Sequence, residues 1–327
     1  MHGILEQVLL DHWAALAPGR PKPGRVWLSA LTPFNRAPNA KAYLFAVADR
    51  ARAPFAYVKI ARDAGSAAFL DTSHASLRAL EGDPRVADLR HTFPRSVLLT
   101  DLAGHRVNVE TYLPGRDVQT MVRAGGADPT HRRTRERVLR WITSFHGRTR
   151  VEAKLGEERV DRMLEAPIEE MRRLFPGQGW LARYLDRLEE RMAELRGTPL
   201  PLVFFHNSLA TKNVKLTGTD IAVIDWEQSV AAGLPLVDLQ HFLMTFWSGC
   251  RRVGYEAAAA AALGARDPLG FFADLRRYEK ALGLAPELRG LLLAESFFIR
   301  ARMVTGYRDR VLECCRLLAE REVGLAA

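Results

Sequence analysis

The chain has 327 residues, of which 48% are hydrophobic and 26% charged, a composition typical of globular proteins with a large core. Its net charge of +9 fits an acidic partner such as nucleotide phosphates. No basic run, zinc-finger spacing or aromatic ribonucleoprotein motif accompanies this charge, so a nucleic-acid partner is not expected.

Cysteine usage, the N-terminal residues and the distribution of apolar residues exclude further classes. Cys250, Cys314 and Cys315 have neither a metal-site spacing nor the even count of a disulfide framework. The N-terminal residues include Glu6 and Asp11 and lack a cationic start followed by an apolar block, so no signal peptide is predicted. No run of about eighteen apolar residues predicts a membrane span. We therefore expect a cytoplasmic protein with no membrane partner.

The first third of the chain predicts one helix followed by a small sheet. Apolar residues at helical spacing predict a helix over 3–16, and a Pro- and Gly-rich linker follows it. Strands are predicted at 25–34, 42–48, 55–60, 96–100 and 106–111, with a helix at 66–81. The segment 35–41, between the first two strands, contains no glycine. These elements predict a five-stranded, mostly antiparallel sheet.

After Pro114-Gly115 the composition becomes helical. Helices are predicted at 132–148, 160–175, 180–195, 235–247, 256–263, 268–282 and 287–320. The change from strands to helices predicts an α+β fold with two domains, 1–113 and 114–327. Five residues of the last helix could line an acceptor cleft, although solvated helix faces are favoured for most of them: Glu295, Arg300, Arg302, Tyr307 and Arg308.

Two short strands end in polar residues. An apolar strand at 203–205 ends in the polar turn 206–208, and a second apolar strand, 221–224, delivers Asp225. Such strands can place the amide of Asn213 beside the carboxylate of Asp225. Amide and carboxylate oxygens are hard donors, the ligands that Mg²⁺ takes when nucleotide phosphates supply the rest. A polar hairpin with an Asx turn is the alternative interpretation.

The spacing of this stretch matches a known pattern, H-[GN]-D-x-x-x-x-N, then a strand ending in I-D-[WFY]-E, then G-x-P-x-x-D-L. The matching residues are His206, Asn207, Asn213, Ile224, Asp225, Trp226, Glu227, Gly233, Pro235, Asp238 and Leu239. The chain therefore resembles the aminoglycoside phosphotransferase and choline kinase family, distant relatives of protein kinases. The resemblance implies a protein-kinase-like bilobal fold. Its N-terminal sheet lobe (1–113) would bind nucleotide, and its larger, mainly helical C-terminal lobe (114–327) would carry the catalytic-loop hairpin and an acceptor subdomain.

The resemblance also implies a nucleotide site for ATP or GTP with Mg²⁺. Lys59 would grip the nucleotide phosphates, and a lysine on the solvent face of a strand is the alternative. Asn213 and Asp225 would hold the metal. Glu110 and Tyr112 belong to a stretch that looks like the hinge between the lobes, where backbone groups bind the base.

The sequence departs from the family at two positions. The catalytic Asp of the family falls on Ser208, so the predicted catalytic loop reads His206, Asn207 and Ser208. The helix glutamate that pairs with the strand lysine falls on Ser73, so Lys59 is expected to be unpaired. The resemblance gives Asp238 the structural role of bracing the loop. We also interpret His146, on a predicted helix, as structural.

Three functions remain open from the sequence. The first is transfer of a γ-phosphate to a hydroxyl of a small molecule or peptide, with a weakened catalytic loop. The second is a pseudokinase that binds nucleotide or a protein partner. The third is a repurposed fold with other group-transfer chemistry. The residues alone do not identify the acceptor.

Overall fold

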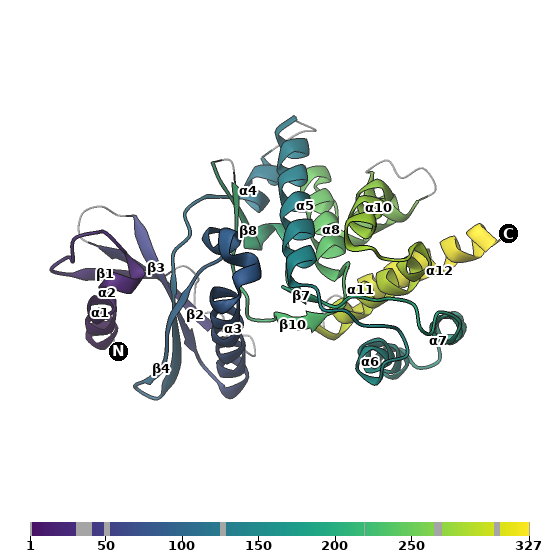
Figure 1. Ribbon diagram of the computed structural model, residues 1–327, viewed down its shortest axis with the longest axis horizontal. Helices are drawn as coiled ribbons and strands as arrows, with labels where there is room; N and C mark the ends of the chain where they lie inside the picture. Colours follow the sequence, from purple (N-terminus) through teal and green to yellow (C-terminus); the bar gives the residue numbers. More distant parts are fainter. Residues whose placement is uncertain are drawn as a thin grey trace. The chain divides into compact units, whose positions relative to one another are not determined.

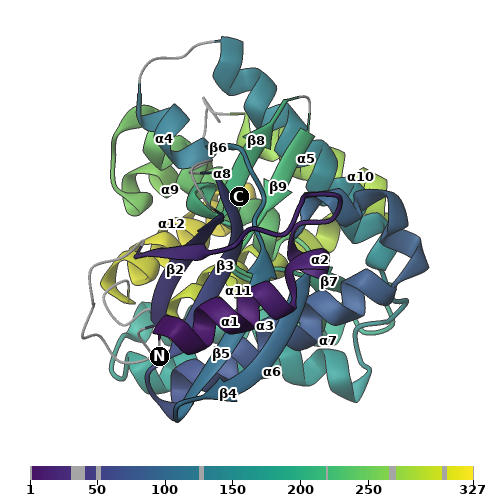
Figure 2. The ribbon, with the colours of Figure 1, turned by 90° about the vertical axis from the view of Figure 1, so that its left-hand side faces the viewer.

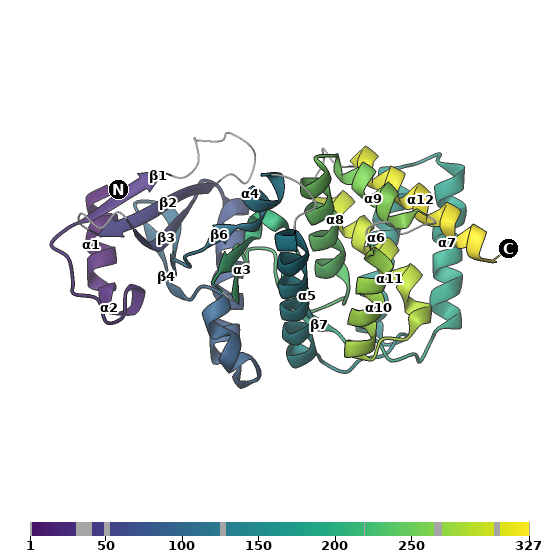
Figure 3. The ribbon, with the colours of Figure 1, turned by 90° about the horizontal axis from the view of Figure 1, so that it is seen from above.

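The computed structural model describes residues 2–30, 41–48, 53–124, 129–218, 220–264, 270–303 and 308–326. Contacts divide the chain into two compact units. The first unit comprises Met1–Gly115 with Lys215–Ser229, and the second comprises Arg116–Val214 with Val230–Ala327. Figures 1 and 3 show most of the strands in the first unit and most of the helices in the second. The predicted α+β fold is therefore confirmed.

The first unit contains the predicted five-stranded sheet. Its strands are β1 (Val26–Ala30), β2 (Lys41–Ala48), β3 (Pro54–Ala61), β4 (Ser96–Leu102) and β5 (His105–Thr111). They lie in the order β1-β2-β3-β5-β4, and each neighbouring pair is antiparallel. The end of the first predicted strand and the glycine-free segment that follows it lie outside the described residues.

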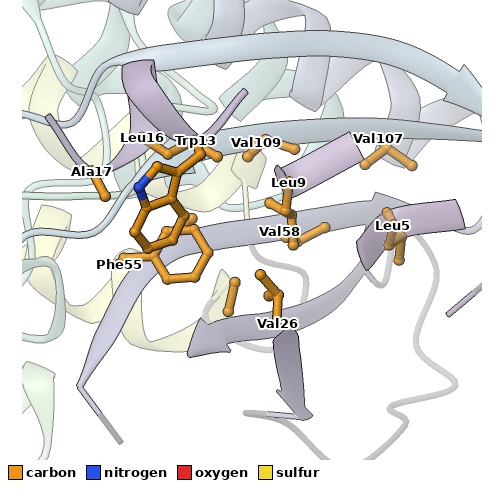
Figure 4. Packing of buried hydrophobic residues seen from close by; sticks show 12 residues of the cluster. Leu5, Leu9, Trp13, Leu16, Ala17, Val26, Phe55, Val58, Val107 and Val109 are labelled. Carbon is orange, nitrogen blue, oxygen red and sulfur yellow. The ribbon is translucent and has the colours of Figure 1, made fainter. Parts of the chain in front are cut away.

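One face of this sheet is apolar and covered by two short helices, α1 (His2–Asp11) and α2 (Trp13–Leu16). Residues that alternate along the strands, such as Val58, point to this face and pack against the helices. Figure 4 shows Trp13 lying against Phe55, and the two rings meet edge to face with centroids 4.8 Å apart. Figure 2 shows α1 lying over the strands.

The opposite face packs against helix α3 (Ala64–Gly82), which contacts β3, β4 and β5. The helix begins with a reciprocal capping box. The Ser66 N–H donates to the Asp63 side chain at 2.7 Å, and the Asp63 N–H donates to Ser66 Oγ at 3.1 Å. A 3₁₀ segment, η2 (Pro84–Thr92), then leads to β4. This face of the sheet carries polar side chains, including Lys59.

The strands of the motif pair differently from the predicted hairpin. The strand at 203–205 is β7, and it pairs with β10 (Val230–Gly233) in the second unit. β9 (Asp220–Val223) instead lies beside β8 (Val214–Thr217). Gly218, with φ of +58°, supplies the left-handed residue that this tight connection requires. Contacts assign Lys215–Ser229 to the first unit, whereas the sequence predicts the whole hairpin in the C-terminal lobe.

Helices make up most of the second unit. They are α4 (Val118–Arg123), α5 (Pro129–Thr149), α6 (Glu158–Leu174), α7 (Gly179–Glu194), α8 (Val237–Arg251), α9 (Tyr255–Leu263), α10 (Phe271–Leu282), α11 (Arg289–Met303) and α12 (Arg308–Ala326). Short segments β6 (Arg116–Asp117), η3 (Thr211–Asn213) and η4 (Pro286–Leu288) connect them. Phe145, Phe242 and Phe297 are fully buried in its core. None of the described helices combines the length and the apolar composition that a membrane span needs.

Replacing Trp13 tests the packing of α1 and α2 on the sheet. Trp13 is 5% exposed, and its indole N–H donates to the Arg20 carbonyl at 2.9 Å. We expect Trp13→Ala to lower the free energy of unfolding by about 3–5 kcal/mol, because it leaves a cavity against Phe55. Urea denaturation measures this change. Ile4→Ala, at a 48% exposed position of α1, should change it by less than about 0.5 kcal/mol. Equal losses for both variants would contradict this description of the core.

Candidate active site

Lys59 lies on the polar face of the sheet and is buried, with 4% of its surface exposed. Its Nζ is 2.9 Å from Glu110 Oε1, 3.4 Å from Glu227 Oε1 and 3.8 Å from Asp225 Oδ1. The expectation that Lys59 is unpaired is therefore wrong, and so is its alternative placement on a solvent face. A buried ammonium needs such charge partners, because the interior alone would not solvate it.

Glu110 provides the shortest of these contacts. Its Oε1 also accepts hydrogen bonds from Ser73 Oγ at 2.9 Å and from Asn108 Nδ2 at 3.0 Å. The backbone of Glu110 pairs with β3 on one side and β4 on the other. The predicted hinge position of Glu110 is thus corrected: it is an interior sheet residue whose side chain holds Lys59. In the sequence, the polar residues Asn108 and Glu110 alternate with Val107 and Val109, and this alternation was the available signal. The structure shows that both polar side chains are buried.

The hydrogen bonds continue beyond Asn108. Ser96 Oγ donates to Asn108 Oδ1 at 2.6 Å, and His74 Nδ1 lies 2.8 Å from Ser96 Oγ. Since the Ser96 hydroxyl donates to Asn108, His74 Nδ1 is the donor to Ser96. Burial lowers the pKa of His74, and the charges of Arg78 and Arg106 act in the same direction. This chain fixes the orientation of the Asn108 amide and hence its donor to Glu110.

An aromatic cluster lies at the end of β5. The Tyr112 ring lies 5.3 Å from Tyr57 and 5.6 Å from Phe45, centroid to centroid. Lys215 Nζ lies 4.6 Å from the Tyr112 centroid and donates to Tyr57 Oη at 3.0 Å and to the Leu113 carbonyl at 3.2 Å. The Tyr112 N–H donates to the Phe55 carbonyl of β3 at 3.0 Å. This backbone group, expected from the sequence to bind the base, is therefore occupied by a hydrogen bond within the sheet. Sequence reasoning missed Lys215.

The turn after β9 supplies two carboxylates. Trp226 is fully buried, donates its indole N–H to the Val223 carbonyl at 3.0 Å and meets Phe93 edge to face. This anchor holds Asp225 and Glu227 on either side of it near Lys59. Asp225 has φ of +71°, and its Oδ1 is buried without a hydrogen bond among the described residues. A strained residue with such an oxygen is typical of a ligand-binding position.

In the second unit, Asp238 braces the predicted catalytic loop. Its two carboxylate oxygens accept the N–H groups of His206 and Asn207 at 2.6 and 2.9 Å. His146 Nε2 lies 3.4 Å from Asp238, and its Nδ1 lies 2.7 Å from the Tyr278 hydroxyl. Burial raises the pKa of Asp238, but the bonds and charges of His146 and His206 outweigh it, so the pKa is lowered. The structural roles predicted for Asp238 and His146 are confirmed.

The loop itself is closed by short contacts. The Ser208 N–H donates to His206 Nδ1 at 3.2 Å, and Asn213 Nδ2 donates to the Ser208 carbonyl at 2.8 Å. Asn207 adopts the left-handed conformation with φ of +60°. Arg300 Nη2 donates to Asn207 Oδ1 at 3.2 Å. His206, Asn207, Ser208 and Asn213 therefore form one hydrogen-bonded group.

Arg300 differs from the solvated residue favoured by the sequence. It lies on α11 with 7% exposure, and burial lowers its pKa. Glu295, on the same helix, is also fully buried. The side chains of Arg302 and Tyr307 lie outside the described residues. Helix α11 thus brings the buried charge of Arg300 to the loop at Asn207.

A cavity of about 510 Å³ adjoins the loop at Asn207. Its lining includes Met163, Pro167, Phe205, Leu234 and Ile299. The backbone of β10 forms one wall at Gly233, where an added Cβ would lie 1.9 Å from the Phe205 ring. Only glycine permits this close approach.

The predicted site residues fall into two groups. Lys59, Glu110, Tyr112 and Asp225 belong to the first unit. His206, Asn207, Ser208 and Asn213 belong to the second. In the first unit, Lys59 contacts Glu110 and Asp225, while Tyr112 belongs to the aromatic cluster. The residues of the second unit are joined by the loop contacts and by Asp238.

Comparison with known proteins agrees with the motif. The profile of the family described as "Phosphotransferase enzyme family" matches residues 38–279. Direct comparison with curated proteins gives no match. Among solved structures, a thermostable mutant of aminoglycoside phosphotransferase APH(4)-Ia is 12% identical, with a TM-score of 0.53 over 96% of this chain and 98% of that chain.

Two further structures resemble the chain less well. An aminoglycoside phosphotransferase from Streptomyces rimosus is 15% identical, with a TM-score of 0.46 over 96% of both chains. A choline/ethanolamine kinase family protein from Mesorhizobium loti is 14% identical, with a TM-score of 0.43 over 95% of this chain and 99% of that chain. Taken with the family match, the structure of APH(4)-Ia shows that the fold is protein-kinase-like.

Removing the charge of Asp238 tests the bracing of the loop. Asp238→Asn places an amide NH₂ against groups that already donate hydrogen bonds. We expect the free energy of unfolding to fall by about 2–4 kcal/mol, measured by urea denaturation. The control Asp186→Asn, at a side chain that is 61% exposed on α7, should change it by less than about 1 kcal/mol. Similar losses for the two variants would contradict the bracing role.

The stability difference between wild type and Asp238→Asn should depend on pH. Because the folded-state pKa of Asp238 lies below its ordinary value of 3.8, its stabilising contribution is fully present above that value. The contribution is lost as the pH falls through the lowered pKa. The stability difference between wild type and Asp238→Asn should therefore be constant near neutral pH and shrink below about pH 4. A difference that grows on acidification would show that the sign is wrong.

Proposed function

Because the chain belongs to the phosphotransferase enzyme family, we propose that it transfers the γ-phosphoryl group of ATP or GTP to a hydroxyl of a small molecule. The observation that carries this proposal is the buried Lys59, whose Nζ lies 3.8 Å from Asp225 Oδ1. A cation suited to nucleotide phosphates thus lies beside a carboxylate suited to their metal ion.

Charge supports a metal ion at this place. Three carboxylates, Glu110, Asp225 and Glu227, lie within 4 Å of a single ammonium, which leaves an excess of negative charge. Asp225 Oδ1, which accepts no hydrogen bond among the described residues, is a suitable hard donor. Asp225 and Asn213 are the proposed ligands of Mg²⁺. When bound, the ion would neutralise charge on the phosphates during transfer.

The aromatic cluster supports a site for the nucleotide base. Tyr57 and Tyr112 present ring faces, and Lys215 adds a donor beside them. Base rings bind such surfaces by stacking. Tyr112 would act through its side chain, because its N–H is used by the sheet.

The loop supports positioning of an acceptor hydroxyl. His206 is 1% exposed and accepts the Ser208 N–H, so it shapes the loop, while Asn207 faces the cavity. The Ser208 hydroxyl can orient an acceptor, but it does not take up a proton near neutral pH. General-base assistance is typically worth ~10²–10⁴ in rate. We therefore propose slow turnover that depends on alignment and charge neutralisation.

The cavity beside Asn207 supports a particular acceptor class. Its volume of about 510 Å³ suits a small organic molecule. Its described lining is mainly apolar, includes Arg162 and contains no acidic side chain. Polycationic acceptors need carboxylates. We therefore propose an alcohol with an apolar body as the acceptor.

A titration with nucleotide and Mg²⁺, followed by a turnover assay on the same sample, tests this function. We expect wild type to bind Mg-ATP or Mg-GTP and Asp225→Asn to bind at least about tenfold more weakly, because a charged metal contact is lost. The difference should shrink in EDTA. Asp220→Asn, at a side chain that is 46% exposed near the start of β9, is the matched control. No binding by wild type in the presence of Mg²⁺ would overturn the proposal, and binding without turnover would favour a pseudokinase.

The substitution Ser208→Asp tests the role of the loop. The new carboxylate restores the family's H-N-D sequence and would supply a general base. We expect turnover of acceptor, or background nucleotide hydrolysis, to rise by up to ~10²-fold. Ser208→Asn, of the same shape without the charge, should give no gain. Loss of a brisk wild-type activity in Ser208→Asp would show instead that Ser208 itself is needed.

A further inference from the structure

The three carboxylates described in contact with Lys59 all come from β5 and the turn after β9. Helix α3 contacts this site through the buried Ser73, whose Oγ donates to Glu110 Oε1 at 2.9 Å. The carboxylate that contacts Lys59 most closely comes instead from β5, at 2.9 Å. We propose that Glu110 is the positioning residue for Lys59, taking the place of a helix carboxylate, and that Ser73 and Asn108 hold Glu110. This inference rests on the proposed function, in which Lys59 binds nucleotide phosphates.

The sheet register sets this geometry. β3 and β5 are antiparallel neighbours, with Lys59 opposite Asn108 and Tyr57 opposite Glu110. Side chains two residues apart on one strand share a face, so Asn108 and Glu110 both lie on the side of Lys59. Diagonal pairs of this kind are within reach of long side chains. The contact between Lys59 and Glu110 therefore follows from backbone pairing.

The hydrogen bonds fix which oxygen Lys59 meets. Two hydrogen-bond donors converge on Glu110 Oε1, Ser73 Oγ at 2.9 Å and Asn108 Nδ2 at 3.0 Å. Lys59 Nζ forms an ion pair with the same oxygen at 2.9 Å. The carboxylate is thus held in one rotamer. A glutamate at position 73 would bring a second negative charge close to the first, and like charges at that distance repel strongly. The small hydroxyl of Ser73 leaves room for the Glu110 carboxylate of β5 and donates a hydrogen bond to it.

The remaining carboxylates explain why positioning matters. Glu227 and Asp225 lie farther from Lys59 Nζ, at 3.4 and 3.8 Å. Without Glu110, the ammonium would be drawn toward them. Asp225 is the proposed metal ligand, so a closer lysine would compete with the ion for it. Glu110 keeps Lys59 and Asp225 apart.

The experiment compares wild type with Glu110→Gln, Ser73→Ala and the double variant Ser73→Glu with Glu110→Gln. The first readout is acylation of Lys59 by an amine-reactive ester without nucleotide, quantified by mass spectrometry. The second is the Kd of Mg-ATP and Mg-GTP by calorimetry. Asp101→Asn, at a side chain that is 71% exposed on β4, is the control.

We expect Glu110→Gln to increase Lys59 acylation several-fold and to raise the nucleotide Kd about tenfold, as loss of a charged hydrogen bond predicts. Ser73→Ala should give smaller changes in the same directions, which keeps the test available if Glu110→Gln does not fold. The double variant returns a carboxylate to the site from α3 and should restore both readouts to within about threefold of wild type. A purely structural role would give no such rescue.

The two readouts separate the possible failures. Wild-type values in both readouts for folded Glu110→Gln would overturn the positioning role. Equal effects of Asp101→Asn and Glu110→Gln would overturn it too. Wild type that binds no nucleotide would overturn the proposed function and with it the link to phosphates, while altered acylation in Glu110→Gln would still support positioning of Lys59.

Discussion

The first unit depends on the burial of one positive charge. An ammonium that is almost fully enclosed needs partners at short range, because desolvation costs several kcal/mol. Carboxylates from two distant segments, one on β5 and two after β9, meet Lys59. The small polar residues around Glu110 complete its hydrogen bonds. A buried network of which only some members are hydrogen-bonded would be destabilising. Replacing Ser73 or Asn108 would therefore also weaken the contact of Glu110 with Lys59.

In the second unit, the buried carboxylate of Asp238 holds the loop at 206–208 in place. Asp238 accepts two loop N–H groups that no strand or helix satisfies. The backbone near it is strained, since Asn207 and Leu236 both have positive φ, at +60° and +79°. Leucine rarely adopts this conformation, so surrounding contacts must hold it. Ionic and hydrogen-bonded contacts thus maintain a loop conformation that local preferences would not.

Local patterns in the sequence predicted much of this architecture. Helical spacing and alternating apolar residues located the sheet strands and most helices, because these signals depend on neighbours in the chain. The motif predicted His206, Asn213 and Asp225 as candidate site residues by spacing alone. The partner of Lys59 was not predictable in this way. It depends on the register between β3 and β5, which are about fifty residues apart in sequence.

Two other features escaped prediction for related reasons. The pairing of β7 with β10, and of β8 with β9, depends on which strands meet in space. Spacing along the chain instead predicts one hairpin from the adjacent motif segments. Lys215 reads as a surface lysine in the sequence, yet it lies among aromatic rings and is 5% exposed. Burial of a single charged residue is a tertiary property.

The location of Glu110 has a consequence for how such a protein could be controlled. In protein kinases, the lysine is paired with a glutamate on a mobile helix, so shifting that helix switches catalysis on or off. Here both members of the pair lie on adjacent hydrogen-bonded strands. Moving α3 would remove the Ser73 hydrogen bond to Glu110 and the contact of His74 with Ser96. The ion pair itself, between residues of β3 and β5, would persist. A switch based on helix movement would therefore not break the ion pair of Lys59 with Glu110.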